Sequence, residues 1–413
     1  MPRPRNCWPT ASSTYSPRPD LNATSSRVDL DVLRQERLAR LRLKLREADL
    51  AGVCFLDPIN VRYAVDVSNM QVWSLHNPVR YAYVPTEGPV VHFEFESCGH
   101  LANGIKTIDE VRPAISWSYM MAGGESQNAA TAWAAEIADL VSRDGGGNRR
   151  LAVDRLDFIG YLALQKQGVE VIDGNALAEL VRVIKTPQEL VALRETIAGC
   201  ETAVHAMQAA LRPGMTEQEL WSVLHQQNIA MGGEWIETRL LTSGPRTNPW
   251  YNECSDRIIE DGDLVAFDTD LVGKLGYCCD ISRTWRAGEG MANDQQRRTY
   301  DLAYNHLNKI TDLVRPGTTM GDIATGFGAM PEGHNTYSCL LHGVGMCDEY
   351  PVAFWQDQRG RYDAVIEPGM VLSVESYLGP EDAAEGVKLE DQVLVTETGV
   401  EIMSSLAFED SWL

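Results

Sequence analysis

The sequence lacks any run of about 18 or more apolar residues, and its first residues lack the apolar core of a secretory signal peptide. We therefore expect a cytoplasmic protein without a membrane partner. Cysteine chemistry is also sparse, because the nine cysteines are odd in number, form no CxxC pair and lie close together only at Cys278 and Cys279. This pattern predicts neither a disulfide framework nor a thiolate zinc site.

Positive charge is in deficit, since 36 Lys and Arg face 58 Asp and Glu, a formal net charge of -22. This balance argues against nucleic acid or an anionic membrane as a partner and favours a cationic or zwitterionic ligand. Hydrophobic residues make up 44% of the 413, which is enough for the cores of two or three domains.

The N-terminal part of the chain alternates helical and strand-like patterns. Residues 1–27 are rich in Pro, Ser, Thr and Arg without periodicity, which predicts an extended arm or a disordered tail. A helical pattern over Leu30–Asp49 leads into the apolar run Gly52–Leu56, and such pairs recur to about residue 180. We therefore predict an α/β domain over residues 28–183. Thr186-Pro187-Gln188-Glu189 reads as a capping box that opens a second domain, residues 184–413.

The stretch Leu264–Trp285 carries the most distinctive charges of the chain. An apolar run ends in Asp268 and Asp270, glycines mark a turn, and a second strand-like run carries Asp280. On a strand, side chains two residues apart share a face, so a hairpin would bring the three carboxylates together. Carboxylates so placed repel one another unless cations lie between them. Taken alone, Asp-x-Asp beside a glycine turn is more often turn chemistry.

Other segments add one imidazole and two further carboxylates to this set. LLHGVG carries His342, EPGMVLSVES carries Glu375 and GVKLEDQVLV carries Glu390. Such a set could hold two divalent ions about 3.5–4 Å apart. Oxygen ligands with one imidazole suit iron, manganese, cobalt or zinc, and the sequence does not choose among them.

This order of ligands, with GYCCDISRTW, HGVG, EPGMVLSVE and KLEDQVLVTE around them, resembles the pita-bread metallohydrolases: aminopeptidase P, prolidase, creatinase and methionine aminopeptidase. The resemblance is dense in the C-terminal half and extends more weakly to about residue 30. It implies a creatinase-like α/β N-terminal domain followed by an α+β pita-bread catalytic domain. Ordinary members have one Asp where this chain offers Asp268 and Asp270, so either the hairpin is one residue longer or both bind metal. We predict six ligands, with both bound.

At two positions this sequence differs from the peptidases in residues that would take part in the reaction. Asp348 stands where those enzymes carry a second histidine before Glu-Tyr-Pro, and SGPRTNPW, ending in Trp250, lacks their histidine after SGPN. The joint absence of these imidazoles argues against peptide hydrolysis. A carboxylate beside a metal centre suits removal of a proton from carbon, and hence β-elimination.

Within the superfamily the pattern resembles the dimethylsulfoniopropionate (DMSP) lyases of the DddP type. The matching segments are Asn69–Pro78, Ile236–Trp250, Ala266–Asp270 and Leu341–Tyr350. The resemblance implies that two metal ions, iron by preference, are bound by six residues, which are Asp268, Asp270, Asp280, His342, Glu375 and Glu390. It further implies Asp348 as the catalytic base, Tyr337 and Trp73 beside the substrate, and a homodimer. A sulfonium cation is attracted to aromatic faces, which suits Trp73.

Less specific explanations remain for several residues. Asp348 could cap its loop, and Trp73 and Trp250 could be core or interface aromatics. Arg246 could neutralise carboxylates near the metals or could only bind the carbonyls of its turn. Lys388 need not contact a substrate. The predicted function is cleavage of DMSP to dimethyl sulfide and acrylate. The alternatives are a hydrolase like aminopeptidase P, prolidase or creatinase, and a pita-bread binding module without catalysis.

Overall fold

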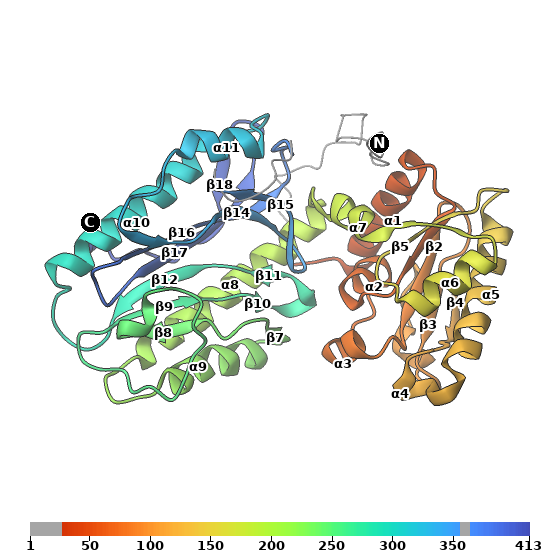
Figure 1. Cartoon of the computed structure of the whole chain (residues 1–413), viewed down its shortest axis with the longest axis horizontal. Coiled ribbons are helices and arrows are strands. Elements are labelled where there is room, and N and C mark those ends of the chain that lie inside the picture. The colour runs from red at the N-terminus through yellow and green to blue at the C-terminus, as the bar shows by residue number, and fades with distance from the viewer. Residues whose placement is uncertain (1–26, 356–363) are drawn as a thin grey trace. The chain divides into compact units, whose positions relative to one another are not determined.

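The computed structural model describes residues 27–355 and 364–413 (Figure 1). Apart from Arg27, the predicted arm therefore lies outside the described residues. The chain divides into two compact units, whose described parts are essentially residues 28–182 and 183–413. No helix in the described part of the chain is long and apolar enough to cross a membrane.

The first unit is a mixed sheet with helices. Its strand order is β4-β3-β2-β1-β5-β6, and β1 pairs antiparallel with β2 and parallel with β5. The strands are β1 (Gly52–Phe55), β2 (Tyr81–Pro85), β3 (Val91–Glu94), β4 (Glu110–Pro113), β5 (Arg150–Val153) and β6 (Glu170–Asp173). The helices are α1 (Leu30–Glu47), α2 (Pro58–Val65), α3 (Gln71–His76), α4 (Tyr119–Ala122), α5 (Ser126–Asp144), α6 (Phe158–Lys166) and α7 (Gly174–Arg182).

The helix and the strand predicted at the start of this unit are present as α1 and β1. Asp29 caps α1 by accepting the backbone N–H groups of Asp31 and Val32, and β1 follows as a fully buried strand. Trp133 of α5 packs between Tyr81 and Trp117, so large aromatic rings fill the core below the sheet.

The second unit is an antiparallel sheet in the order β15-β14-β16-β17-β12-β9-β8, with β13 on β16 and β18 on β17. Its strands are β8 (Leu241–Ser243), β9 (Leu264–Asp268), β12 (Ser282–Arg286), β13 (His334–Thr336), β14 (Cys339–Val344), β15 (Asp348–Phe354), β16 (Val371–Pro380), β17 (Val387–Val395) and β18 (Val400–Ile402). A small second sheet joins β7 (Trp235–Ile236), β10 (Leu271–Val272) and β11 (Cys278–Cys279). Its helices are α8 (Pro187–Ala210), α9 (Glu217–Ala230), α10 (Asp294–Leu313) and α11 (Met320–Phe327).

Both units also contain short 3₁₀ turns, which are η1 (Gly99–Ala102), η2 (Gly123–Glu125), η3 (Gly244–Thr247), η4 (Lys274–Gly276) and η5 (Asp410–Trp412). The predicted fold class, an α/β unit followed by an α+β pita-bread unit, is confirmed. The capping box is also confirmed, since Thr186 and Glu189 bond each other's backbone at the start of α8. The helix that this box opens, α8, runs unbroken over 24 residues.

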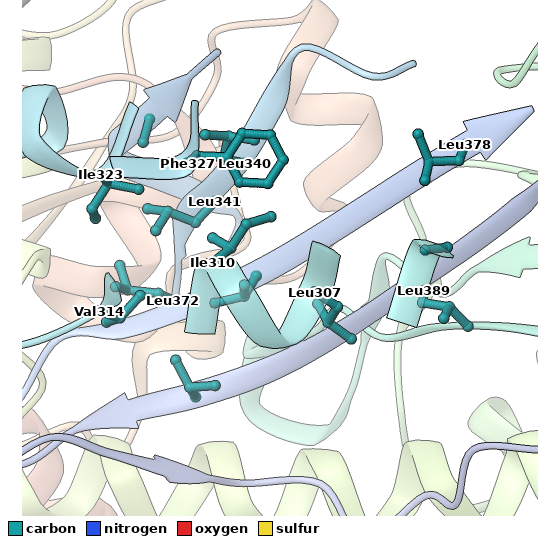
Figure 2. Packing of buried hydrophobic residues seen from close by; sticks show 14 of the residues in the cluster. Leu307, Ile310, Val314, Ile323, Phe327, Leu340, Leu341, Leu372, Leu378 and Leu389 are labelled. Atoms are coloured by element: carbon teal, nitrogen blue, oxygen red, sulfur yellow. The ribbon is translucent and has the colours of Figure 1, made fainter. Parts of the chain in front are cut away.

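Helices cover one face of the large sheet and leave the other for polar groups. In Figure 2, Leu307 and Ile310 of α10 lie against Leu341, Leu372 and Leu389 of the sheet. The α8 and α9 pair covers β9 and β12 in the same way, through a second apolar cluster. Because side chains alternate along a strand, the intervening residues of these strands point to the opposite face. That face carries Ser373, Glu375, Lys388, Glu390 and Gln392.

The predicted hairpin is only partly correct. β9 does pair with β12, and Asp268 lies opposite Ser282. The strand ends at Asp268, however, and Asp270 has a positive φ of 35°. The inference that Asp268 and Asp270 share a strand face was therefore wrong, because the chain turns into β10 between them.

A buried carboxylate fixes the loop that follows β8. Glu217, fully buried in the first turn of α9, accepts hydrogen bonds from the N–H and hydroxyl groups of both Ser243 and Ser255. Arg246 also pairs with Glu217. Arg246 also donates to the backbone carbonyl of Glu253 at 2.8 Å, so it binds a carbonyl of its turn, and the carboxylate that it neutralises is none of the predicted metal ligands.

We predict that Glu217→Ala lowers the free energy of unfolding by about 3 kcal/mol, because the buried donors and the arginine lose their shared acceptor. Glu219→Ala, on the same helix but in an exposed capping box, is the matched control and should cost about 1 kcal/mol. Thermal unfolding of the two variants measures both effects. Equal, small losses would show that Glu217 is not the anchor of this loop.

Candidate metal centre

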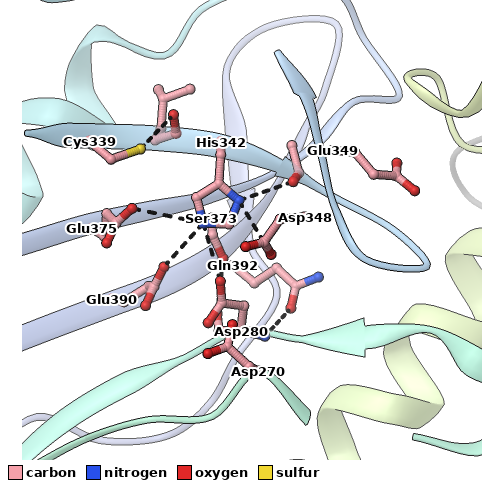
Figure 3. A network of polar contacts seen from close by, with 12 residues as sticks. Asp270, Asp280, Cys339, His342, Asp348, Glu349, Ser373, Glu375, Glu390 and Gln392 are labelled. Carbon is pink, nitrogen blue, oxygen red and sulfur yellow. Dashed lines mark hydrogen bonds and ion pairs between the residues drawn. The ribbon is translucent and has the colours of Figure 1, made fainter. Parts of the chain in front are cut away.

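Strand pairing brings five of the six predicted ligands together at the polar face of the large sheet. Figure 3 shows four of these five, Asp280, His342, Glu375 and Glu390, with Asp270 and Asp348 beside them. Glu375 of β16 lies directly opposite Glu390 of β17. Ser282 of β12 lies opposite both Glu390 and Asp268, the last residue of β9, and Asp280 lies two residues before Ser282. His342 comes from β14, the other neighbour of β16.

The ligand atoms form three overlapping groups, within each of which they lie no more than 4.8 Å apart. The groups are Asp268, Asp280 and Glu390; His342, Glu375 and Glu390; and Asp280, His342 and Asp348. Overlap through shared carboxylates is the arrangement that two neighbouring cations would need.

The imidazole of His342 points into the carboxylates. Its Nε2 lies 3.2 Å from Asp280 Oδ2 and 3.8 Å from oxygens of both Glu375 and Glu390. Its Nδ1 faces the carbonyl of Gly343 at 3.1 Å and Asp348 Oδ1 at 3.7 Å. A ligand histidine commonly has its second nitrogen oriented in this way.

Lys388 is part of the cluster, which the sequence pattern did not reveal. Its side chain is fully buried, and Nζ lies 3.1 Å from Asp268 Oδ2, 2.9 Å from Glu375 Oε2 and 2.8 Å from Glu390 Oε2. Lys388 lies two residues before Glu390 on β17, so strand alternation could have predicted that they share a face. The ammonium supplies positive charge where four carboxylates converge.

The shifted pKa values of the carboxyl groups show that their burial as charged groups is unfavourable. Burial, and then repulsion by Glu390, raise the pKa of both Asp268 and Asp280. Burial likewise raises the pKa of Glu375 from 4.5 to about 7, although Lys388 opposes the shift. Burial also opposes ionisation of Glu390, but Lys388 and His342 lower its pKa overall. The cluster therefore favours additional cations.

The residues fit divalent metal ions. Oxygens Oδ1 of Asp268 and Oδ1 of Asp280 are buried and have no hydrogen-bond partner among the described residues. Buried polar atoms are normally satisfied, so these oxygens are open positions for ligation. The donor set of carboxylates and one imidazole suits hard or borderline divalent ions.

Asp270 lies beside this set without belonging to the three groups. Its Oδ2 accepts a hydrogen bond of 2.6 Å from Thr238 Oγ1. Burial, and then the charges of Asp268 and Asp348, raise the pKa of Asp270, so it is within electrostatic range of the centre. The structure thus places Asp270 at the edge of the cluster.

Asp348 stands at the mouth of the cluster, with 60% of its side chain exposed. The next residue, Glu349, is buried, bonds Lys185 Nζ at 2.7 Å and accepts the N–H of Met346. A Cβ at Gly345 would approach the Glu349 carboxylate to 2.5 Å, which explains the second glycine of HGVG. This anchoring fixes the start of β15, where Asp348 is the first residue.

Aromatic residues of the second unit border the centre. Trp250 is buried and stacks on Tyr377, with ring centroids 5.9 Å apart. Tyr337 meets Tyr251, a residue that the sequence did not single out, at 5.1 Å. Trp73, the other predicted substrate residue, lies on α3 of the first unit, where its ring meets the edge of Phe95.

We predict that Lys388→Met destabilises the metal-free protein by about 3–5 kcal/mol, because buried carboxylates lose their internal cation. Manganese should restore part of the loss, since a bound ion stabilises the folded state. Thermal unfolding with chelator and with Mn²⁺ tests this. The control Lys274→Met, at an exposed position, should change stability by less than about 0.5 kcal/mol. A Lys388→Met protein as stable as the parent in chelator would contradict the assigned role.

Comparison with known proteins shows which family the chain is similar to. Residues 191–397 match the model of metallopeptidase family M24. The chain is 40% identical over 390 residues to the dimethylsulfoniopropionate lyase DddP of Roseovarius nubinhibens, covering 92% of this chain and 87% of that protein. It is 30% identical to the Xaa-Pro aminopeptidase of Escherichia coli over 57% of this chain and 59% of that one.

Solved structures agree on the fold. The Xaa-Pro dipeptidase from Bacillus anthracis superimposes with a TM-score of 0.73 at 22% identity, covering 91% of this chain and 99% of the other. The prolidase from Pyrococcus horikoshii gives 0.72 at 21% identity, with 91% and 99% covered. The chain therefore belongs to metallopeptidase family M24 and, within it, to the group of the DddP proteins.

Proposed function

We propose that this protein is a metal-dependent lyase that cleaves DMSP to dimethyl sulfide and acrylate. The observation that carries the proposal is the placement of Asp348, an exposed carboxylate 3.7 Å from the ring of His342 at the edge of a buried ligand cluster. The 40% identity to a DMSP lyase over 92% of the chain supports the same substrate.

In this proposal Asp268, Asp270, Asp280, His342, Glu375 and Glu390 hold two divalent ions, with iron as the first choice and manganese, cobalt or zinc as alternatives. When bound, such ions would ligate the substrate carboxylate and make its α-hydrogens more acidic. Asp270 joins the set through its place at the edge, positioned by Thr238.

Asp348 then acts as the base. Its carboxylate takes a proton from the α-carbon, and the electron pair of that C–H bond forms the double bond of acrylate. The Cβ–S bond breaks, and its electron pair leaves on sulfur, so the sulfonium departs as neutral dimethyl sulfide. Because Glu349 and Lys185 fix the adjacent backbone, Asp348 can meet the substrate without a large rearrangement of its loop.

The substrate would also meet aromatic side chains, whose faces suit its cationic end. Tyr337 would lie against the substrate, and Trp73 would reach it in the active site of the partner subunit of the proposed homodimer. A zwitterion is compatible with the net charge of -22, which disfavours nucleic acid and anionic membranes. We further propose a cytoplasmic homodimer, as the resemblance to the DddP type implies.

A peptidase-like hydrolase is the second candidate, favoured by the M24 match and by the Xaa-Pro enzymes of similar fold. Asp348 and Trp250 stand where the peptidases have histidines, which argues against it. A prolidase-like or creatinase-like hydrolase would turn over Xaa-Pro dipeptides or small C–N compounds and release no dimethyl sulfide from DMSP.

The test is to mix metal-loaded protein with DMSP and to measure dimethyl sulfide in the headspace, with a chelated sample beside it. We expect metal-dependent release, and we expect Asp348→Asn to lower the rate about 100- to 10,000-fold, because the general base is lost. Metal content of the variant should be unchanged.

The matched control is Asp312→Asn, at an 82% exposed side chain on α10, which should leave the rate unaffected. Full activity of Asp348→Asn would remove Asp348 from the mechanism. Absence of dimethyl sulfide from the parent protein, with hydrolysis of a dipeptide panel, would replace the lyase with a hydrolase.

A further inference from the structure

Tyr251 has a backbone conformation that tyrosine rarely adopts. Its φ is 79°, in the left-handed region that favours glycine, and the residue is 54% exposed. A half-exposed ring gains only part of the free energy of burial, so its own packing does not explain the strain. Strained residues of this kind cluster at binding and catalytic sites.

The segment around Tyr251 is held rigidly on both sides. Asn248 donates to the carbonyls of Pro380 and Ala383 at 2.8 and 3.0 Å, and Trp250 stacks on Tyr377. Beyond the tyrosine, Asn252 donates to the carbonyls of Arg246 and Pro249. These bonds enforce the left-handed turn and fix the direction of the Tyr251 ring.

The ring is directed toward Tyr337 and the metal centre. The two ring centroids are 5.1 Å apart and the planes meet at 80°, so the rings form two walls of a corner. Partial burial raises the pKa of Tyr251, and Glu375 and Asp268 raise it further, which places the phenol within range of the cluster. Burial and then Glu375 raise the pKa of Tyr337 as well. Both phenols are thus neutral at physiological pH and offer aromatic faces.

A zwitterionic substrate must bind with its two ends in different surroundings. Its carboxylate is attracted to the cations of the centre, and its positive end is repelled by them and by Lys388, whose ammonium lies among Asp268, Glu375 and Glu390. The positive end therefore needs a neutral surface that still attracts a cation, and aromatic faces provide one.

We propose that Tyr251, with Tyr337, forms a cation-binding aromatic corner that holds the positive end of the zwitterion and so determines substrate specificity. This inference rests on the proposed function and adds Tyr251 to it. The hydrogen bonds that fix the backbone of residues 248–252 hold the Tyr251 ring in place before the substrate binds.

The test compares two ligands of one shape in the metal-loaded, full-length protein. β-Alanine betaine carries a trimethylammonium group, and its tert-butyl analogue has the same shape without positive charge. Calorimetric titration should show that the parent binds the betaine about 3- to 30-fold more tightly than the analogue. Tyr251→Phe, which keeps the ring, should preserve this preference, and Tyr251→Leu should abolish it without weakening the neutral analogue.

The Tyr251→Gly variant distinguishes a role of Tyr251 in binding from a role in stability alone. Glycine relieves the positive φ, so we expect an equal or higher unfolding midpoint together with loss of the preference for the betaine. A lower midpoint with the preference intact would show that Tyr251 is only structural. An unchanged preference in Tyr251→Leu would overturn the inference, even if the parent releases dimethyl sulfide. Conversely, the parent protein could release no dimethyl sulfide while Tyr251→Leu still abolishes the preference for the betaine. That result would support the cation site at Tyr251 and contradict DMSP as the substrate.

Discussion

The structure depends on the convergence of buried carboxylates. Asp268, Asp280, Glu375 and Glu390 are withdrawn from water on one sheet face, and within residues 27–355 and 364–413 only Lys388 and His342 pair with their carboxylates. Four negative charges against at most two positive ones leave a deficit of two or more. Protonation can reduce this deficit, as the raised pKa of Glu375 indicates, but divalent cations remove it while satisfying the open oxygens.

The fold makes this convergence possible through strand alternation. Leucine and valine side chains of β16 and β17 anchor α10, and the residues between them include Glu375 and Glu390. Loss of helix packing and loss of the site are therefore coupled, because the same strands provide both. The cluster occupies a rigid sheet, whereas Asp348 begins a strand at its margin and Tyr251 lies on a braced loop. Peptidases and this chain can thus share one scaffold while differing at the margin.

Much of this was predictable from the sequence, because the relevant signals are local. Capping at Thr186 and the strands carrying His342, Glu375 and Glu390 follow from short patterns. The role of Lys388 could also have been inferred from its two-residue spacing to Glu390.

Other features could not be predicted, because they depend on tertiary structure. The placement of Asp270 depends on a turn that ends β9 early, and Arg246 pairs with a glutamate 29 residues away. The left-handed backbone of Tyr251 has no sequence signature, since tyrosine disfavours it.

The number of metal ions per chain tests the central claim most directly. The chelated protein would be titrated with divalent metal by calorimetry in buffers of different ionisation enthalpy, and the bound metal counted afterwards by elemental analysis. We expect two ions per chain, bound with release of protons because the pKa values of Asp280 and Glu375 are raised without metal. One ion or none, or uptake without proton release, would contradict a centre built from buried carboxylates.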